Sequence, residues 1–162
     1  MSTFKSALLI VFIGLAGCSS VSEIQPVSGV SFPSGYSVGT VEVEDKTGKF
    51  YDFKDDYTVT GLMQEAMEEA LEKAGKRGAS SNSLTYKVAV IQYQQGSAVA
   101  RWMMPGVGKT ILSVEGTVVD ASGAVIATSQ ATESIGAGGG FTAGAWKYIF
   151  GNVADKLVGD LP

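Results

Sequence analysis

The chain has 162 residues, 45% of them hydrophobic and 17% charged, and its net charge is −4. This length and composition indicate one folded domain with a single apolar core, and they exclude a wholly disordered chain. The Lys and Arg residues form no basic stripe that could neutralise phosphates, so we expect no nucleic-acid binding.

The first 17 residues have the pattern of an exported precursor. Lys5 precedes an apolar run, residues 7–15, which is too short to span a bilayer and has the length of a signal-peptide core. The run leads into Leu-Ala-Gly-Cys at Leu15–Cys18, which resembles the lipobox of bacterial lipoproteins. The alternative is a buried cysteine at the end of an apolar helix.

The lipobox resemblance implies cleavage between Gly17 and Cys18, and acylation of Cys18 on its thiol and its new amino group. Residues 1–17 would then be the signal peptide. Because Ser19 rather than Asp follows the cysteine, the resemblance also implies export to the outer membrane of a Gram-negative cell. Two or three acyl chains on Cys18 are enough for stable attachment to that membrane. Cys18 is the only cysteine, so the mature chain forms no internal disulfide.

After the anchor, residues 18–37 are rich in Ser, Gly, Pro and Val and predict a flexible tether. Residues 38–162 predict a single periplasmic domain. Hydrophobic periodicity predicts a strand over 38–44, a helix over 62–74, strands over 84–93, 111–120 and 124–133, and a helix over 146–157. We therefore expect an α+β fold in the order β-α-β-β-β-α. Its sheet would be mostly antiparallel with about four strands, and both helices would pack on one face.

Two groups of acidic residues are candidate metal sites by their composition. The first consists of Asp45, Asp52, Asp55 and Asp56. Its spacing lacks the glycine and glutamate positions of an EF-hand. The second, on the first helix, consists of Glu65, Glu68, Glu69 and Glu72. A di-metal site of that kind also needs histidines, and the chain has none. We therefore predict that the first group forms turns and that the second is a solvated helix face. We predict no metal and no cofactor.

Two glycine-rich stretches are candidate phosphate-binding loops by their composition. In Pro105–Thr110, the sequence PGVGKT has Met103 where a phosphate loop needs its first glycine, and it precedes a strand rather than a helix. We therefore expect a turn and no bound nucleotide. Gly136–Gly140 does precede a helix. No Lys or Arg lies between Lys109 and Lys147 to pair with an anion, so flexible linkage or close packing is favoured over ligand binding.

Beside the lipobox and the acidic helix, the distinctive positions are Arg101, Gly106–Gly108, Asp120–Gly123 and Gly138–Phe141 before the last helix. Together, over roughly residues 36–160, they resemble a family of uncharacterised Gram-negative outer-membrane lipoproteins whose domain has no known function. These are glycine and turn positions, so they imply a fold rather than an activity. More distantly, the element order is similar to that of periplasmic αβ lipoproteins such as the curli secretion lipoprotein and the penicillin-binding-protein activator LpoB. That similarity implies action together with partners.

The connection Ala98–Pro105 carries Arg101, Trp102, Met103 and Met104, residue types that are favoured at binding surfaces. The alternative is that Trp102 and Met103 fold back onto the core. We predict an outer-membrane-anchored, periplasm-facing lipoprotein that acts without catalysis as an interaction or assembly component. Its partner would be an envelope protein or further copies of itself.

The alternative function is a periplasmic small-ligand-binding protein or an enzyme with no recognisable motif. An enzyme would have to work without histidine and without a free cysteine. Lys109 and Ser113 come nearest to a catalytic Ser-Lys pair, and no supporting motif surrounds them. We therefore predict that the protein is not an enzyme.

Overall fold

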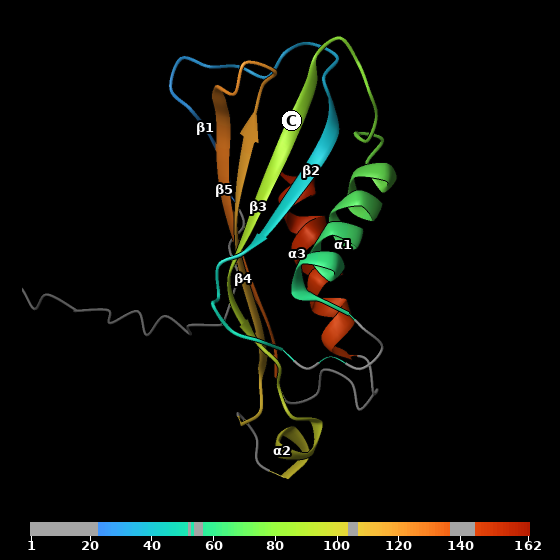
Figure 1. Ribbon diagram of the computed structural model, residues 1–162, viewed down its shortest axis with the longest axis vertical. Coiled ribbons are helices and arrows are strands. Elements are labelled where there is room, and N and C mark those ends of the chain that lie inside the picture. The colour runs from blue at the N-terminus through green and yellow to red at the C-terminus, as the bar shows by residue number, and fades with distance from the viewer. Residues whose placement is uncertain (1–22, 52, 54–56, 104–106, 137–144) are drawn as a thin grey trace, which may run out of the picture.

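The computed structural model describes residues 23–51, 53, 57–103, 107–136 and 145–162. Five strands and three helices lie in this part of the chain (Figure 1). In order they are β1 (Glu23–Pro26), β2 (Ser37–Asp45), α1 (Val59–Lys73), β3 (Ser83–Gln94), α2 (Ala98–Met103), β4 (Thr110–Val119), β5 (Val125–Ile135) and α3 (Ala145–Gly159).

The strands form one five-stranded mixed sheet in the order β1-β5-β4-β3-β2. β2 and β3 are parallel and are joined by α1, whereas the other neighbouring pairs are antiparallel. The predicted α+β class is confirmed, but the sheet has one strand more than expected and a parallel pair at one edge. That pair has a physical reason. A strand, a helix and a strand in succession return the chain to the same end of the sheet, which is what a parallel pair requires.

The sequence did not predict β1 and α2. β1 lies within residues 18–37, the predicted tether, and pairs with β5 from Glu23 opposite Gln130 to Pro26 opposite Ala127. A four-residue strand that ends in proline is too short to show hydrophobic alternation, so its pairing is set by β5 rather than by its own pattern. α2 is a six-residue helix within a segment that was predicted to be a loop.

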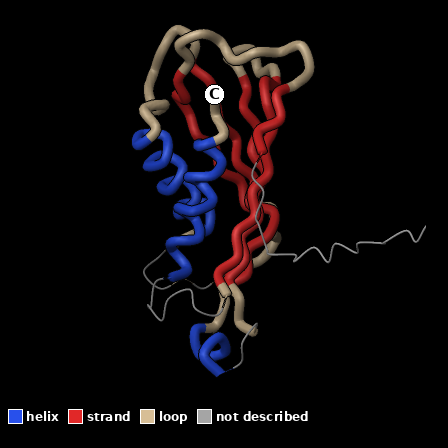
Figure 2. Tube along the Cα trace, turned by 180° about the vertical axis from the view of Figure 1, so that it is seen from behind, coloured by secondary structure: helices blue, strands red, loops and turns tan. Residues whose placement is uncertain are grey.

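α1 and α3 lie side by side on one face of the sheet, as expected (Figure 1, Figure 2). α1 begins after Thr58, whose hydroxyl accepts a hydrogen bond from the Gly61 N–H at 3.0 Å. It is followed by Gly75, whose φ of 66° favours glycine. The apolar sides of both helices and the facing side of the sheet form one core. Its largest buried side chains include Tyr86, Tyr93, Phe150, Met63, Met67 and Leu71.

The opposite face of the sheet is not covered by α1 or α3 (Figure 2). Polar side chains alternate there with the core residues, and neighbouring strands place Glu42 beside Lys87, and Thr117 beside both Lys87 and Thr128. Glu115 lies two residues before Thr117 on the same side of β4 and is exposed. We call this surface, which includes Glu42, Lys87, Glu115, Thr117 and Thr128, the open face.

Candidate interaction surfaces

β3 and β4 extend beyond α1 and α3 and end in a projecting tip that contains α2 (Figure 1). Hydrogen bonds hold the base of this tip. The Gly96 N–H donates to Thr110 Oγ1 at 3.1 Å, and the Ala100 N–H donates to Ser97 Oγ at 3.2 Å. The first bond joins the segment before α2 to the start of β4, and the second caps the start of α2.

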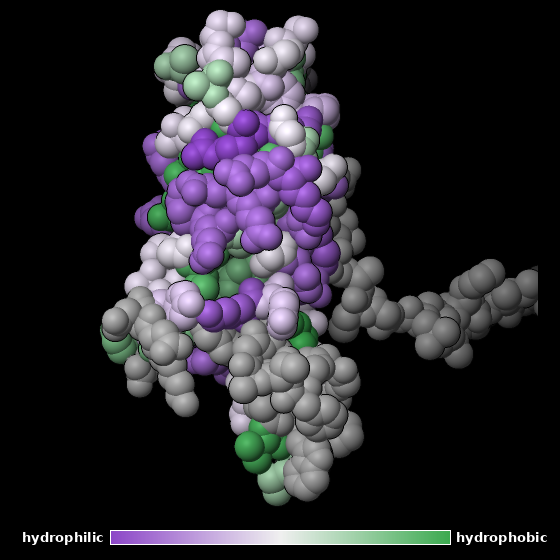
Figure 3. All heavy atoms as spheres, turned by 90° about the vertical axis from the view of Figure 1, so that its right-hand side faces the viewer, coloured by the Kyte–Doolittle hydropathy of each residue, from purple (hydrophilic) through white to green (hydrophobic). Residues whose placement is uncertain are grey.

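The tip exposes apolar side chains to solvent. Val99 is 66% exposed, Met103 67% and Val107 45%. Figure 3 shows hydrophobic atoms at this end of the molecule, separate from the hydrophilic band over the helical side. Single exposed apolar residues are common, but three in one short connection form a candidate contact surface. We call Val99, Met103 and Val107 the apolar tip.

The residues predicted to contact a partner belong to this connection. The Met103 side chain lies in solvent rather than on the core. Arg101 and Trp102 lie in α2, but their side chains are outside the described part of the structure, as is all of Met104. Contact with a partner therefore stays a prediction for these four residues.

Other predicted sites fall partly outside the described residues. Gly17, Cys18 and 137–140 of the glycine-rich loop are outside them, so cleavage, acylation and ligand binding stay predictions. Ser113 is buried in β4, and its hydroxyl accepts a hydrogen bond from Thr132 at 2.9 Å, so it is not presented to a substrate. Among the described residues, no acidic, His or Cys side chains cluster in a group that could hold a metal, and no helix is long and apolar enough to cross a membrane.

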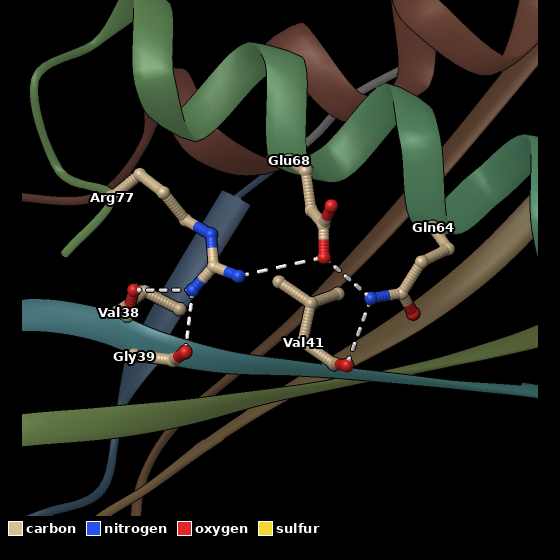
Figure 4. Close-up of polar contacts among 6 residues, drawn as sticks. All are labelled: Val38, Gly39, Val41, Gln64, Glu68 and Arg77. Atoms are coloured by element: carbon tan, nitrogen blue, oxygen red, sulfur yellow. Dashed lines mark hydrogen bonds and ion pairs between the residues drawn. The ribbon is translucent and has the colours of Figure 1, made fainter. Parts of the chain in front are cut away.

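β2 is an edge strand, and side chains of α1 and of the segment after it donate hydrogen bonds to its backbone carbonyl groups (Figure 4). Arg77, which follows α1, donates to the carbonyl oxygen of Val38 at 3.1 Å and to that of Gly39. Gln64 of α1 donates to the carbonyl oxygen of Val41 at 3.1 Å. The first half of this edge is therefore hydrogen-bonded within the molecule.

Glu68 connects the two donors. Its Oε1 accepts a hydrogen bond from Gln64 Nε2 at 2.8 Å and lies 3.5 Å from Arg77 Nη2. A backbone hydrogen bond from Gly78 to Val38, at 3.2 Å, closes the same edge. Because unpaired edge groups recruit strands from other chains, this network blocks strand addition over the first half of β2.

The network corrects the expected solvated face of α1. Glu68 is half-buried and bonded, whereas Glu65, Glu69 and Glu72 are exposed. The spacing of four residues between Gln64 and Glu68 was a visible signal of a helix-surface pair. The contact with Arg77 had no such signal, because it depends on where β2 lies in the sheet.

Two hollows lie on the open face, and Glu115 lines both. The first, of about 500 Å³, is also lined by Gln25, Thr117, Thr128 and Gln130. The second, of about 610 Å³, is also lined by Glu42, Glu44, Lys46 and Lys87. Their volumes suit small ligands, but both hollows are open to solvent and polar. Such a surface suits contact with another protein better than enclosed binding of a small molecule.

Two buried tyrosines have structural roles. Tyr86 Oη is 2.9 Å from Ser129 Oγ and donates to the carbonyl oxygen of Leu157 at 3.3 Å. Burial raises the pKa of Tyr86 to about 12, although the bond to Ser129 lowers it in part. Burial also raises the pKa of Tyr93, whose hydroxyl has no hydrogen-bond partner within the described residues. Both side chains are buried in the core, so neither hydroxyl is presented to a substrate.

A family model described as a domain of unknown function, DUF4410, matches residues 20–139. The chain belongs to the DUF4410 family. The matched residues include all five strands together with α1 and α2, and they end before α3. No curated protein matches the sequence.

Solved structures similar to this DUF4410 protein include two PelC dodecamers from Paraburkholderia phytofirmans. One, a PelC variant, is 19% identical to this chain and has a TM-score of 0.51; the match spans 85% of this chain and 97% of the PelC chain. The other is 15% identical, covers 87% and 98%, and has a TM-score of 0.54. A Xanthomonas campestris protein of the DUF330 family is 13% identical, covers 82% and 88%, and has a TM-score of 0.49. At these identities the likeness concerns the fold alone.

Proposed function

We propose that this DUF4410 protein is an outer-membrane lipoprotein that acts without catalysis, as an assembly component of the cell envelope. Cys18 would carry the lipid anchor, and the domain would face the periplasm and associate with copies of itself. The lipobox supports the anchor. The dodecameric state of two PelC structures with a similar fold supports self-association. The distant resemblance to the curli secretion lipoprotein and LpoB, which act with partners, points the same way.

A sheet that α1 and α3 cover on one side only is the observation that carries this proposal. The open face presents both signs of charge, because Glu42 pairs with Lys87 at 3.2 Å and Glu115 lies on the next strand. A polar surface of mixed charge suits a non-obligate protein interface, whose composition is close to that of the remaining surface. The blocked edge of β2 also favours association through a face over strand addition.

The test is the molar mass of the lipidated protein in detergent, measured by light scattering over a range of concentrations. We expect an oligomer for the wild-type protein. Glu115→Lys changes the charge of the open face by two units and is expected to lower the mass. Glu72→Lys makes the same charge change on exposed α1 and should leave the mass unchanged. A wild-type monomer at every concentration refutes self-association, and equal effects of the two variants refute the open face as its site.

A further inference from the structure

The direction of β1 shows which end of the sheet lies nearest to the start of the folded domain. β1 is antiparallel to β5, with Glu23 opposite Gln130 and Pro26 opposite Ala127, so the first residue of β1 lies at its end toward Ile135. Ile135 pairs with Thr110, the first residue of β4 after the tip. The start of β1 therefore points toward the end of the sheet that carries the apolar tip.

The connection from the anchor to the sheet is short. Cys18 lies five residues before Glu23. Five extended residues span at most about 18 Å. The same number of residues separates Gln130 from Ile135, which corresponds to about 17 Å of strand. An acylated Cys18 can therefore reach the level at which β4 begins, and α2 projects beyond that level (Figure 1).

The side chains at this end have the chemistry of a membrane-contacting surface. The apolar tip consists of Val99, Met103 and Val107, all substantially exposed. Tyr148, which is also exposed, lies in the first turn of α3. This turn lies toward the tip, because Phe150 packs against Tyr93 near the end of β3, with ring centroids 5.4 Å apart. Apolar side chains at the point of a projection, with an amphipathic tyrosine set back from it, suit the order of acyl chains and headgroups in a bilayer.

We propose that the apolar tip inserts into the surface of the lipid bilayer that holds Cys18. This inference rests on the proposed lipid anchor. The short connection keeps the tip at a high effective concentration near the bilayer, so the modest burial of three side chains is enough to orient the domain. A free protein partner would not gain this advantage. The strands of the sheet then run away from the membrane, with the turn at Asp120–Gly123 at the end of the β4–β5 pair away from it.

The test uses the full lipidated protein in phosphatidylethanolamine–phosphatidylglycerol vesicles whose acyl chains carry bromine. Acylation blocks the only native thiol, so a fluorophore sensitive to polarity labels a single introduced cysteine. Val99→Cys and Met103→Cys place it on the apolar tip, and Ala121→Cys places it in the exposed turn at the other end. We expect blue-shifted emission and quenching by the brominated chains at the two tip positions, and neither at Ala121.

A matched pair of double variants tests whether the apolar side chains cause insertion. The label is placed at Val107→Cys in both. Val99→Asp with Met103→Asp should abolish its quenching. Val27→Asp with Val30→Asp removes two less exposed apolar side chains from another connection and should leave quenching unchanged. Equal quenching in the two double variants overturns the inference.

Mass spectrometry of the same samples separates this inference from the proposed function. Acylated Cys18 with an unquenched tip overturns the inference and leaves the anchor in place. An unmodified Cys18 overturns both. A blue shift that appears without vesicles and grows with protein concentration indicates docking onto a second copy, and it also overturns insertion into lipid.

Discussion

One added methyl group at Gly116 is expected to destabilise the core. Gly116 lies in β4 between Val88 of β3 and Ser129 of β5. A Cβ atom at this position would lie 2.3 Å from Ser129 Oγ and 2.7 Å from a ring carbon of Tyr86. Both separations are shorter than real Cβ contacts, so Ser129 and Tyr86 must move. The 2.9 Å hydrogen bond between their hydroxyl groups then lengthens or breaks.

The size of the effect follows from three contributions. Overpacking of a dense core costs about 1–3 kcal/mol. Loss of one buried hydrogen bond adds about 1 kcal/mol. Alanine gains about 0.5–1 kcal/mol over glycine in a strand, because it loses less backbone freedom on folding. We therefore expect Gly116→Ala to lower the free energy of unfolding by about 2 kcal/mol, which for a domain of this size lowers Tm by about 4–8 °C.

The assay is urea unfolding at pH 7, followed by far-UV circular dichroism. Gly151→Ala in α3 is the matched control, because a Cβ there meets no described atom within 4 Å. It should stabilise the protein by about 0.5–1 kcal/mol through helix propensity. Adding Ser129→Ala to Gly116→Ala should restore part of the loss, since it removes the nearest atom. An unchanged midpoint for Gly116→Ala, or an equal loss for Gly151→Ala, would refute the packing argument.

The pKa of Tyr86 is about 12 in the folded protein against an ordinary value of 10.0, so the folded state holds the phenolic proton more tightly. This difference contributes about 3 kcal/mol to the free energy of unfolding below pH 10, and the contribution is lost as the pH rises from 10 to 12. Tyr86→Phe should therefore flatten the profile of the free energy of unfolding against pH over this range. An equally steep profile would contradict this. Tyr93→Phe should keep or raise Tm by removing an unpartnered buried hydroxyl, and a loss above about 1 kcal/mol would show an unseen partner. Arg77→Ala with Gln64→Ala should expose the β2 edge and cause association beyond the wild-type oligomer, growing with concentration in size-exclusion chromatography. An elution profile equal to that of the wild type at every concentration would count against the blocking role.

Much of the helical layer could be predicted because helix periodicity is a local signal. Met63, Met67 and Leu71 recur every four residues, and all three are buried in α1. The parallel pairing of β2 and β3 was not predicted, because alternation in each strand does not report its neighbour. β1 carried no local signal, because its four residues acquire strand structure by pairing with β5.

The candidate surfaces were predictable only in part. The residue types of the connection after β3 predict a contact site, and this contact stays a prediction. Met103 in that connection is exposed. The role of Arg77 was not predictable, because a single arginine after a helix has many possible partners. Its bonds to Val38 and Gly39 exist because the parallel pairing places β2 beneath the end of α1. Contacts that depend on which strands and helices lie side by side were thus not predictable from the sequence alone.

The two proposals constrain each other through the geometry of the sheet. With the apolar tip in the bilayer, the strands run away from the membrane, and the open face is perpendicular to the membrane plane. Neighbouring anchored copies lie beside it, so Glu42, Lys87 and Glu115 would face them. Restriction to a membrane surface raises the local concentration of partners, so a polar contact that forms in detergent should form there at a lower protein concentration. The effect of Glu115→Lys should therefore be greater for lipidated protein on vesicles than in detergent, and an effect seen only in detergent would contradict this orientation.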